Sequence, residues 1–240
     1  MENYIQIKLP SRCIPYSGVD PTTIQIRTLK GRDEKLIAEM SDSNFDKKAN
    51  ILLASILKGI EPSKLTTGDR LHLLVWEVIH SYSKDFHVEF ECDHCWQKSD
   101  YLVDLSKLDI AELPEDYKEP YEVKLPDSGT IVKLRLITID DLFKVSEIEK
   151  LGQNVWLYRY ALSIVDEKGI WDKVEMLENL SVKDMAVIRA FHEKFIHGPK
   201  MEAKYECPKC GGTGEIPVPF RLKMLLPYGK ELRAFVGDAI

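Results

Sequence analysis

Two Cys-X-X-Cys pairs, Cys92/Cys95 and Cys207/Cys210, constrain this chain more than any other feature of its sequence. Two residues between the cysteines let a tight turn direct both thiolates at one point, and two facing turns supply four ligands at about 2.3 Å in a tetrahedron. This arrangement is a zinc ribbon, so the sequence predicts one structural Zn²⁺ per chain. Four thiolates leave no open coordination position, so a catalytic zinc is not expected.

The separation of the two pairs along the chain is unusual. Knuckles in a compact ribbon lie about twenty residues apart, whereas residues 96–206 separate these two. We therefore expect an N-terminal arm, helices and the first zinc knuckle in residues 1–95, and an inserted hairpin and helical subdomain in residues 96–206. Residues 207–240 contain the second zinc knuckle and the C-terminal tail. We expect the three parts to form one cooperative unit.

Two alternatives to the four-cysteine site remain open. The four thiols could pair as two local disulfides or stay free, although a secreted disulfide framework would scatter its cysteines and a reducing compartment disfavours the bridges. His94 lies inside the first pair and could replace a cysteine as ligand. The fifth cysteine, Cys13, lacks a partner, and we interpret it as a small apolar residue rather than a reactive thiol.

Composition limits the classes of function. The 240 residues are 44% hydrophobic, which suffices for one large domain or two small ones with a proper core. A formal net charge of -6 removes the usual electrostatic basis for binding a polyanion, so nucleic acid is not expected as a partner. No signal-like start and no apolar run long enough to span a bilayer occur, so we expect a soluble protein made in a cytoplasm, with no membrane partner.

Hydrophobic periodicity predicts an α+β fold, with a helical core, short β-hairpins and a split zinc ribbon whose knuckles lie at hairpin tips. Apolar residues recur at helical spacing from residue 31 and over residues 45–57, 70–82, 140–151, 155–165 and 182–196, the last opening at a predicted N-cap, Ser181. Alternation predicts strands at residues 4–9, 23–27, 86–91, 101–103, 121–125, 130–137, 202–206 and 215–220. Residues 166–171 are predicted to form a polar turn, and residues 222–240 give only weak signals.

No catalytic constellation can be assembled from the sequence. The carboxylates Asp140, Asp141, Glu147 and Glu149 are explained by a solvated helix start, where acidic residues complement the positive helix end. The glycine-rich residues 211–214 lack the Lys-Ser/Thr of a phosphate loop. We therefore expect no enzyme and no small-molecule substrate.

Several stretches together resemble a phage protein family. They are Leu9-Pro10-Ser11-Arg12 with Pro15-Tyr16, IQIRTLKGRDE at residues 24–34, LTTGDRLHLLVWEVIHSY at residues 65–82 followed by the first knuckle, and residues 164–191 leading to the second. In these the chain resembles the baseplate hub assembly protein family of T-even-type contractile-tailed bacteriophages, often described as hub assembly chaperones. The resemblance covers most of the chain.

The resemblance implies a non-enzymatic tail protein that binds baseplate hub and tail proteins, as an assembly factor or chaperone or as a minor structural component. It implies action in the host cell cytoplasm during virion assembly, and it leaves open retention in the virion tail baseplate. The alternative is a zinc-ribbon factor of the nucleic-acid-binding or transcription-related class. A local basic patch near the second knuckle keeps this alternative open: Lys200, Lys204, Lys209, Arg221 and Lys223.

Overall fold

The structure is a computed structural model that describes residues 2–153 and 155–227. Its α-helices are α1 Gly31–Ala38, α2 Phe45–Ile56, α3 Thr67–Ser81, α4 Ile139–Lys150, α5 Val155–Ser163, α6 Ile170–Glu178, α7 Val182–Lys194 and α8 Leu222–Leu225. Its strands are β1 Ile5–Gln6, β2 Gln25–Ile26, β3 Leu57–Lys58, β4 Asp85–Glu91, β5 Lys98–Asp104, β6 Ile110–Ala111, β7 Tyr121–Lys124, β8 Ile131–Leu134, β9 Gly198–Pro199, β10 Glu202–Glu206 and β11 Thr213–Pro217. Short 3-10 turns lie at Pro21–Thr23, Pro62–Lys64 and Leu105–Lys107. The α+β class is confirmed.

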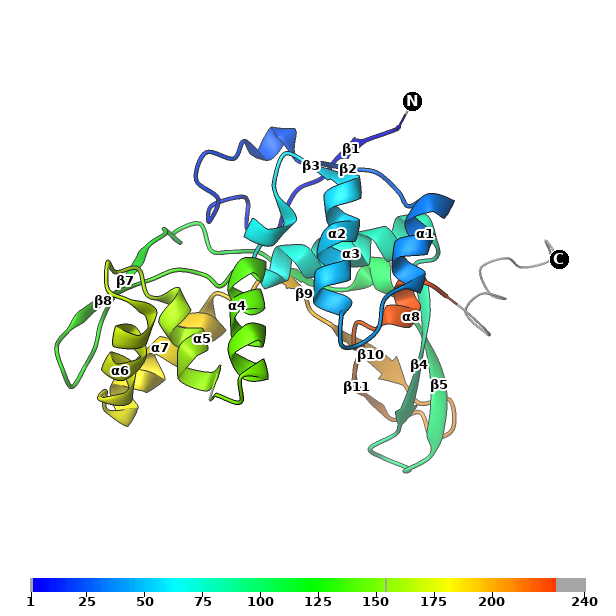
Figure 1. Cartoon of the computed structure of the whole chain (residues 1–240). Helices are drawn as coiled ribbons and strands as arrows, with labels where there is room; N and C mark the ends of the chain where they lie inside the picture. Colours follow the sequence, from blue (N-terminus) through cyan, green and yellow to red (C-terminus); the bar gives the residue numbers. More distant parts are fainter. Residues whose placement is uncertain (1, 154, 228–240) are drawn as a thin grey trace.

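The elements divide into two lobes (Figure 1). One lobe, which we call the ribbon lobe, contains α1 to α3, α8, the three-stranded sheet β1-β2-β3 and the hairpins β4-β5 and β10-β11. The insert lobe contains the hairpin β7-β8 and helices α4 to α7. The short pair β6-β9 lies between the lobes. All strand pairs are antiparallel.

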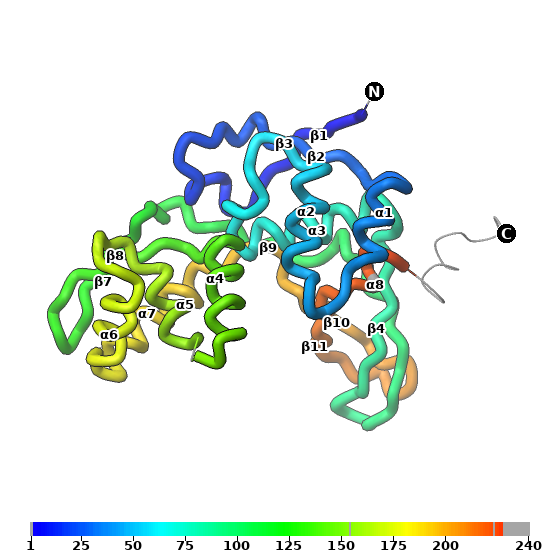
Figure 2. Tube along the Cα trace, viewed as in Figure 1, coloured from blue at the N-terminus to red at the C-terminus, as the bar shows by residue number. Residues whose placement is uncertain are grey.

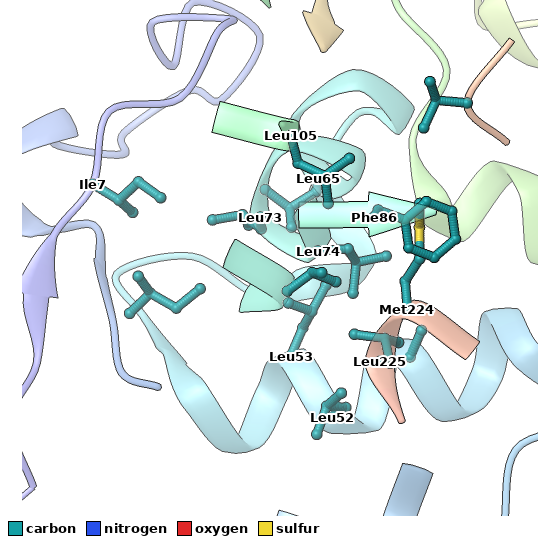
Figure 3. Packing of buried hydrophobic residues seen from close by; sticks show 14 of the residues in the cluster. Ile7, Leu52, Leu53, Leu65, Leu73, Leu74, Phe86, Leu105, Met224 and Leu225 are labelled. Carbon is teal, nitrogen blue, oxygen red and sulfur yellow. The ribbon is translucent and has the colours of Figure 1, made fainter. Parts of the chain in front are cut away.

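Helix α3 is the centre of the ribbon lobe. The Thr66 side chain accepts a hydrogen bond from the Asp69 N–H and so caps the first turn. Leu73, Leu74 and Val78 lie at helical spacing and are buried. Figure 3 shows Leu73 and Leu74 among buried side chains from α2, β4 and α8. The labelled residues of this cluster are Ile7, Leu52, Leu53, Leu65, Leu73, Leu74, Phe86, Leu105, Met224 and Leu225.

The insert lobe has a buried cluster of its own. It is built from the β7-β8 hairpin and helices α5 to α7, with Leu134, Ala161 and Ile188 completely buried. The Phe195 ring packs against Tyr117 at a centroid distance of 4.7 Å and against Tyr121 at 5.0 Å. The helical insert therefore has an independent apolar interior.

The two lobes meet where the chain leaves the insert lobe and crosses the first turn of α3. A Cβ atom built on Gly68 would lie 2.1 Å from the carbonyl oxygen of His197, so only glycine permits this backbone approach. His197 Nδ1 donates to the Phe195 carbonyl, so its Nε2 accepts from the Thr66 hydroxyl at 2.6 Å. The Tyr16 hydroxyl donates to buried Asp69 beside them. We call this contact of Tyr16, Thr66, Gly68, Asp69 and His197 the junction.

Several predicted elements differ in extent from the observed ones. The strands predicted at residues 4–9 and 23–27 pair over only two residues each, because their neighbours bend into the N-terminal arm. The polar turn predicted at residues 166–171 is wrong at its last two residues, because α6 begins at Ile170. The N–H of Gly169, the residue before the helix, donates to the Asp172 side chain. Of the weakly patterned tail, residues 222–225 form α8 and residues 228–240 lie outside the described part.

Within the described residues, no helix combines the length and apolar character needed to cross a membrane.

Candidate metal centre

Two β-hairpins carry the two Cys-X-X-Cys turns. In the first hairpin, β4 pairs with β5 from Asp85 opposite Asp104 to Glu91 opposite Lys98. In the second, β10 pairs with β11 over a shorter ladder of the same antiparallel kind. The two hairpins extend side by side from the ribbon lobe (Figure 2), with both turns at their tips. The predicted order of strand, knuckle and strand is confirmed in both copies.

The two knuckles have the same backbone hydrogen bond although their sequences differ. In the first, the N–H of Trp96 donates to the carbonyl of Cys92 at 2.8 Å. In the second, the N–H of Gly211 donates to the carbonyl of Cys207 at 2.9 Å. The residue after the last cysteine of each pair therefore closes the turn.

That closing residue has a left-handed backbone in both knuckles. Gly211 has φ 70°, which costs glycine little, but Trp96 has φ 56°, where a residue with a Cβ pays about 1–2 kcal/mol. The Trp96 side chain is 72% exposed, so core packing does not offset this cost. Glycine therefore fits the closing position of the second knuckle better than tryptophan fits that of the first.

The knuckles bring all four sulfurs together. The Sγ atoms of Cys92, Cys95, Cys207 and Cys210 lie within 4.8 Å of one another. Across the two hairpins, Cys92 Sγ lies 3.8 Å from Cys210 Sγ, and Cys95 Sγ lies 3.8 Å from Cys207 Sγ. A tetrahedron with metal–sulfur distances of about 2.3 Å has edges of about 3.8 Å. The donor set and its spacing therefore fit a single thiolate-bound zinc ion.

Backbone amides favour the thiolate form at two of these cysteines. Burial opposes ionisation of Cys92, but the N–H groups of His94 and Cys95 and the neighbouring thiols lower its pKa to about 6. The N–H of Lys209 likewise lowers the pKa of Cys207. Amides directed at sulfur are the usual outer support of a thiolate metal site.

At Cys210, crowding of the sulfurs raises the pKa of the thiol instead of lowering it. The N–H of Gly212 lies 3.4 Å from Cys210 Sγ and lowers the pKa of this thiol, but burial and the three neighbouring cysteines raise it to about 12. Four thiolates packed this closely repel one another. A divalent cation at their centre would remove that repulsion and displace the remaining protons.

His94 bridges the hairpins instead of joining the sulfur cluster. Its Nε2 lies 3.0 Å from the carbonyl oxygen of Thr213, which can only accept, so Nε2 is the donor. Cys13 lies in the N-terminal arm, 7% exposed, and burial raises its pKa to about 11. This environment fits the expectation of a small buried residue better than that of a reactive thiol.

Sequence reasoning did not identify the contacts that support the cluster. The Tyr205 hydroxyl donates to Cys92 Sγ at 3.9 Å, and Lys209 Nζ donates to the Lys98 carbonyl at 3.1 Å, joining the two hairpins. Tyr205 lies two residues before Cys207, so strand alternation places both on the same face. That alternation was the available signal for Tyr205.

The carboxylates at the start of α4 have structural partners. Asp141 is buried and accepts two hydrogen bonds from the Arg135 guanidinium, at 2.6 and 2.9 Å, and also bonds the Thr138 N–H. Asp140 pairs with Lys144 at 2.8 Å. These contacts agree with the interpretation of a helix start.

The family comparison covers almost the whole chain. A family model described as T4 bacteriophage base plate protein matches residues 1–226. Comparison with curated proteins and with solved structures gave no match.

Proposed function

The chain belongs to the T4 bacteriophage base plate protein family, and we propose that it acts in assembly of the baseplate hub. Membership of this family supports a structural or assembly role in the phage baseplate. The finer proposal is a non-enzymatic assembly factor or chaperone, or a minor structural component, whose partners are hub and tail proteins. It acts in the host cell cytoplasm during virion assembly.

The second part of the proposal is that Cys92, Cys95, Cys207 and Cys210 hold one structural Zn²⁺. The observation that supports it is the gathering of four sulfurs, within 4.8 Å, from two hairpins separated by the entire insert. Four protein ligands would saturate the ion, so it would hold the hairpins together and perform no chemistry on a substrate. A fixed pair of hairpins gives an assembly protein a surface of constant shape.

The metal is tested by its stoichiometry in the purified full chain. We expect one zinc per chain and protection of four thiols from alkylation until a chelator is added. Cys207→Ser should lose the zinc, whereas the matched control Cys13→Ser, which changes a buried cysteine outside the cluster, should retain it. Absence of stoichiometric zinc, or equal zinc content in both variants, would contradict the proposal.

The hub role is tested in infected cells. Hub proteins should co-purify with a tagged full chain, identified by mass spectrometry, and should be recovered in smaller amounts with Cys207→Ser than with Cys13→Ser. Recovery of tail proteins without any hub component would leave the baseplate assignment and refute the hub role.

The described contacts of Lys204 and Lys209 do not favour the nucleic-acid-binding alternative. Lys204 on β10 lies opposite Glu215 on β11, and Glu202 and Glu206 flank it on the same strand. Lys209 donates to the Lys98 carbonyl. These two lysines therefore lie beside acidic side chains or are already bonded, which does not favour a continuous positive face around them.

A further inference from the structure

We propose that residues 232–240 of this chain dock as a short amphipathic helix in an apolar groove beside α8 of the same molecule. This segment lies beyond Pro227, the last residue that the structure describes. The lining of the groove, the place where the described chain ends and the sequence that follows all favour this docking. None of these three features depends on the metal or on the hub role.

The groove lies between helix α1, the start of α2 and the short helix α8 (Figure 1). Its volume is about 760 Å³, and most of the residues that line it are apolar. The Phe45 and Phe220 rings, whose centroids lie 6.1 Å apart, form part of the lining. Both rings and Leu226 are only half-buried, although they pack against the core of the ribbon lobe. The groove therefore exposes apolar surface that is continuous with this core.

The described chain ends at the wall of the groove. Leu226 lines the groove and follows α8 directly, with its N–H donating to the Leu222 carbonyl at 3.3 Å. Residues 227–231 need only turn back over the groove, and five residues reach up to about 17 Å. A segment tethered this closely has an effective concentration on the order of millimolar at the groove. A free partner of the same intrinsic affinity would need that concentration to compete, so the tether selects the segment of this chain as the occupant.

The sequence after the tether has an apolar face at helical spacing. Five apolar residues recur at positions i, i+3, i+4, i+7 and i+8: Leu232, Phe235, Val236, Ala239 and Ile240. At 100° per residue these side chains occupy an arc of about 140°, as on a helix that packs one face against a core. The pattern is too short for a stable isolated helix, and Gly237 weakens it further. The segment therefore needs a surface to pack against, and a helix in an apolar groove is a common mode of recognition.

The charges beside this face complement those of the groove. On a helix, Arg233 borders one side of the apolar face, and Glu231 and Asp238 border the other. In the groove, Asp42 comes from the wall of α1 and α2, and Arg221 from the wall of α8. Neither of these two has an ion-pair partner among the described residues. One of the two directions of the helix places opposite charges together on both sides, and such exposed pairs set direction more than affinity.

Amide hydrogen exchange of the full chain, as purified, tests the docking. Residues 232–240 exchange slowly only if they fold onto the protein, so we expect these amides to be protected. Phe235→Asp should reduce their protection about tenfold or more, because it places a charge against the apolar lining. The matched control is Ala234→Asp, which introduces the same charge on the opposite face of the helix and should leave the protection unchanged.

A second pair of variants locates the docking site. Ala38 is exposed, lines the groove and is the last residue of α1, so Ala38→Arg places a long side chain in the groove without removing a core residue. It should reduce the protection of residues 232–240 as Phe235→Asp does. Ala54→Arg is the same change at an exposed position of α2 that does not line the groove, and it should have no effect. Circular dichroism and the melting temperature establish that all four variants are folded.

Four results would overturn the proposal. The first is rapid exchange of residues 232–240 in the parent protein, and the second is equal exchange in Phe235→Asp and Ala234→Asp. Protection that survives Ala38→Arg would show that the segment packs elsewhere. Protection that increases with protein concentration would show that the groove takes the segment of a second copy and not that of its own chain.

Discussion

Glu77 gives the sharpest test of the energetics of the ribbon lobe. It lies in the middle of α3, 0% exposed, and its Oε2 accepts a hydrogen bond from Ser81 at 2.9 Å. Its Oε1 has no partner in the described structure. Burial raises the pKa of this carboxyl to about 8, although Ser81 and the nearby Arg27 act to lower it. The carboxyl therefore stays protonated in the folded protein at neutral pH.

The sign of the stability effect follows from proton counting. Below the ordinary pKa of 4.5 both states are protonated and Glu77 contributes no pH dependence. Between that value and about 8 the unfolded chain loses its proton while the folded chain keeps it, so the free energy of unfolding falls as pH rises. At 1.36 kcal/mol per pH unit, the loss by pH 7 is at most about 3.4 kcal/mol. Glu77→Gln keeps the shape and removes the titration, so it should gain up to about 4 kcal/mol at pH 8 and almost nothing at pH 4.

The assay is urea unfolding of the full chain and of Glu77→Gln across this pH range, at constant zinc. Glu193→Gln, an exposed change on α7, controls for the loss of a carboxylate as such. The relevant quantity is the difference between variant and parent at each pH, because other groups titrate in both proteins. A difference independent of pH, or one that shrinks towards pH 8, would refute the reasoning.

Three further predictions concern the metal, the junction and a buried histidine. Cys207→Ser or a chelator should lower the melting temperature of the whole chain, because structural zinc contributes roughly 10–16 kcal/mol. Circular dichroism should still show the helices of the insert. An unchanged melting temperature at full zinc loss would show that the metal does not stabilise the fold. Gly68→Ala should cost more than about 2 kcal/mol by urea unfolding, because its Cβ meets the His197 carbonyl, whereas Gly31→Ala, with open space around its Cβ, should not destabilise. Burial lowers the pKa of His192 to about 4, so the free energy of unfolding should rise as the pH increases from about 4 to 6.5. His192→Gln should flatten that rise, measured by urea unfolding. An identical pH profile in the variant would show that His192 does not titrate in this range.

Local patterns predicted the parts of the site that local chemistry determines. The cysteine spacing predicted the sulfur cluster, and alternation placed both knuckles at hairpin tips. Periodicity also predicted α3, whose observed range Thr67–Ser81 begins at a Thr66 cap, and α7 with its Ser181 cap.

Features that depend on distant contacts were missed. The β6-β9 pair joins only Ile110 to Pro199 and Ala111 to Gly198, too few residues for an alternation signal. Helix α6 was hidden because a polar turn leads directly into its first residues. The separate core of the insert lobe could not be predicted, since periodicity shows that a helix has an apolar face but not which other faces it meets.

The junction limits how the two lobes can move relative to each other. The chain returns from the insert lobe through Gly198, whose backbone lies directly against that of Gly68. Because both residues are glycines, neither has a side chain at this contact that could change rotamer. Rotating one lobe about this point would break the buried bonds among Tyr16, Thr66 and His197 and would also pull Ile139, the first residue of α4, out of the apolar core of the ribbon lobe. Hydrogen bonds and apolar packing therefore oppose rotation of one lobe against the other at the same place.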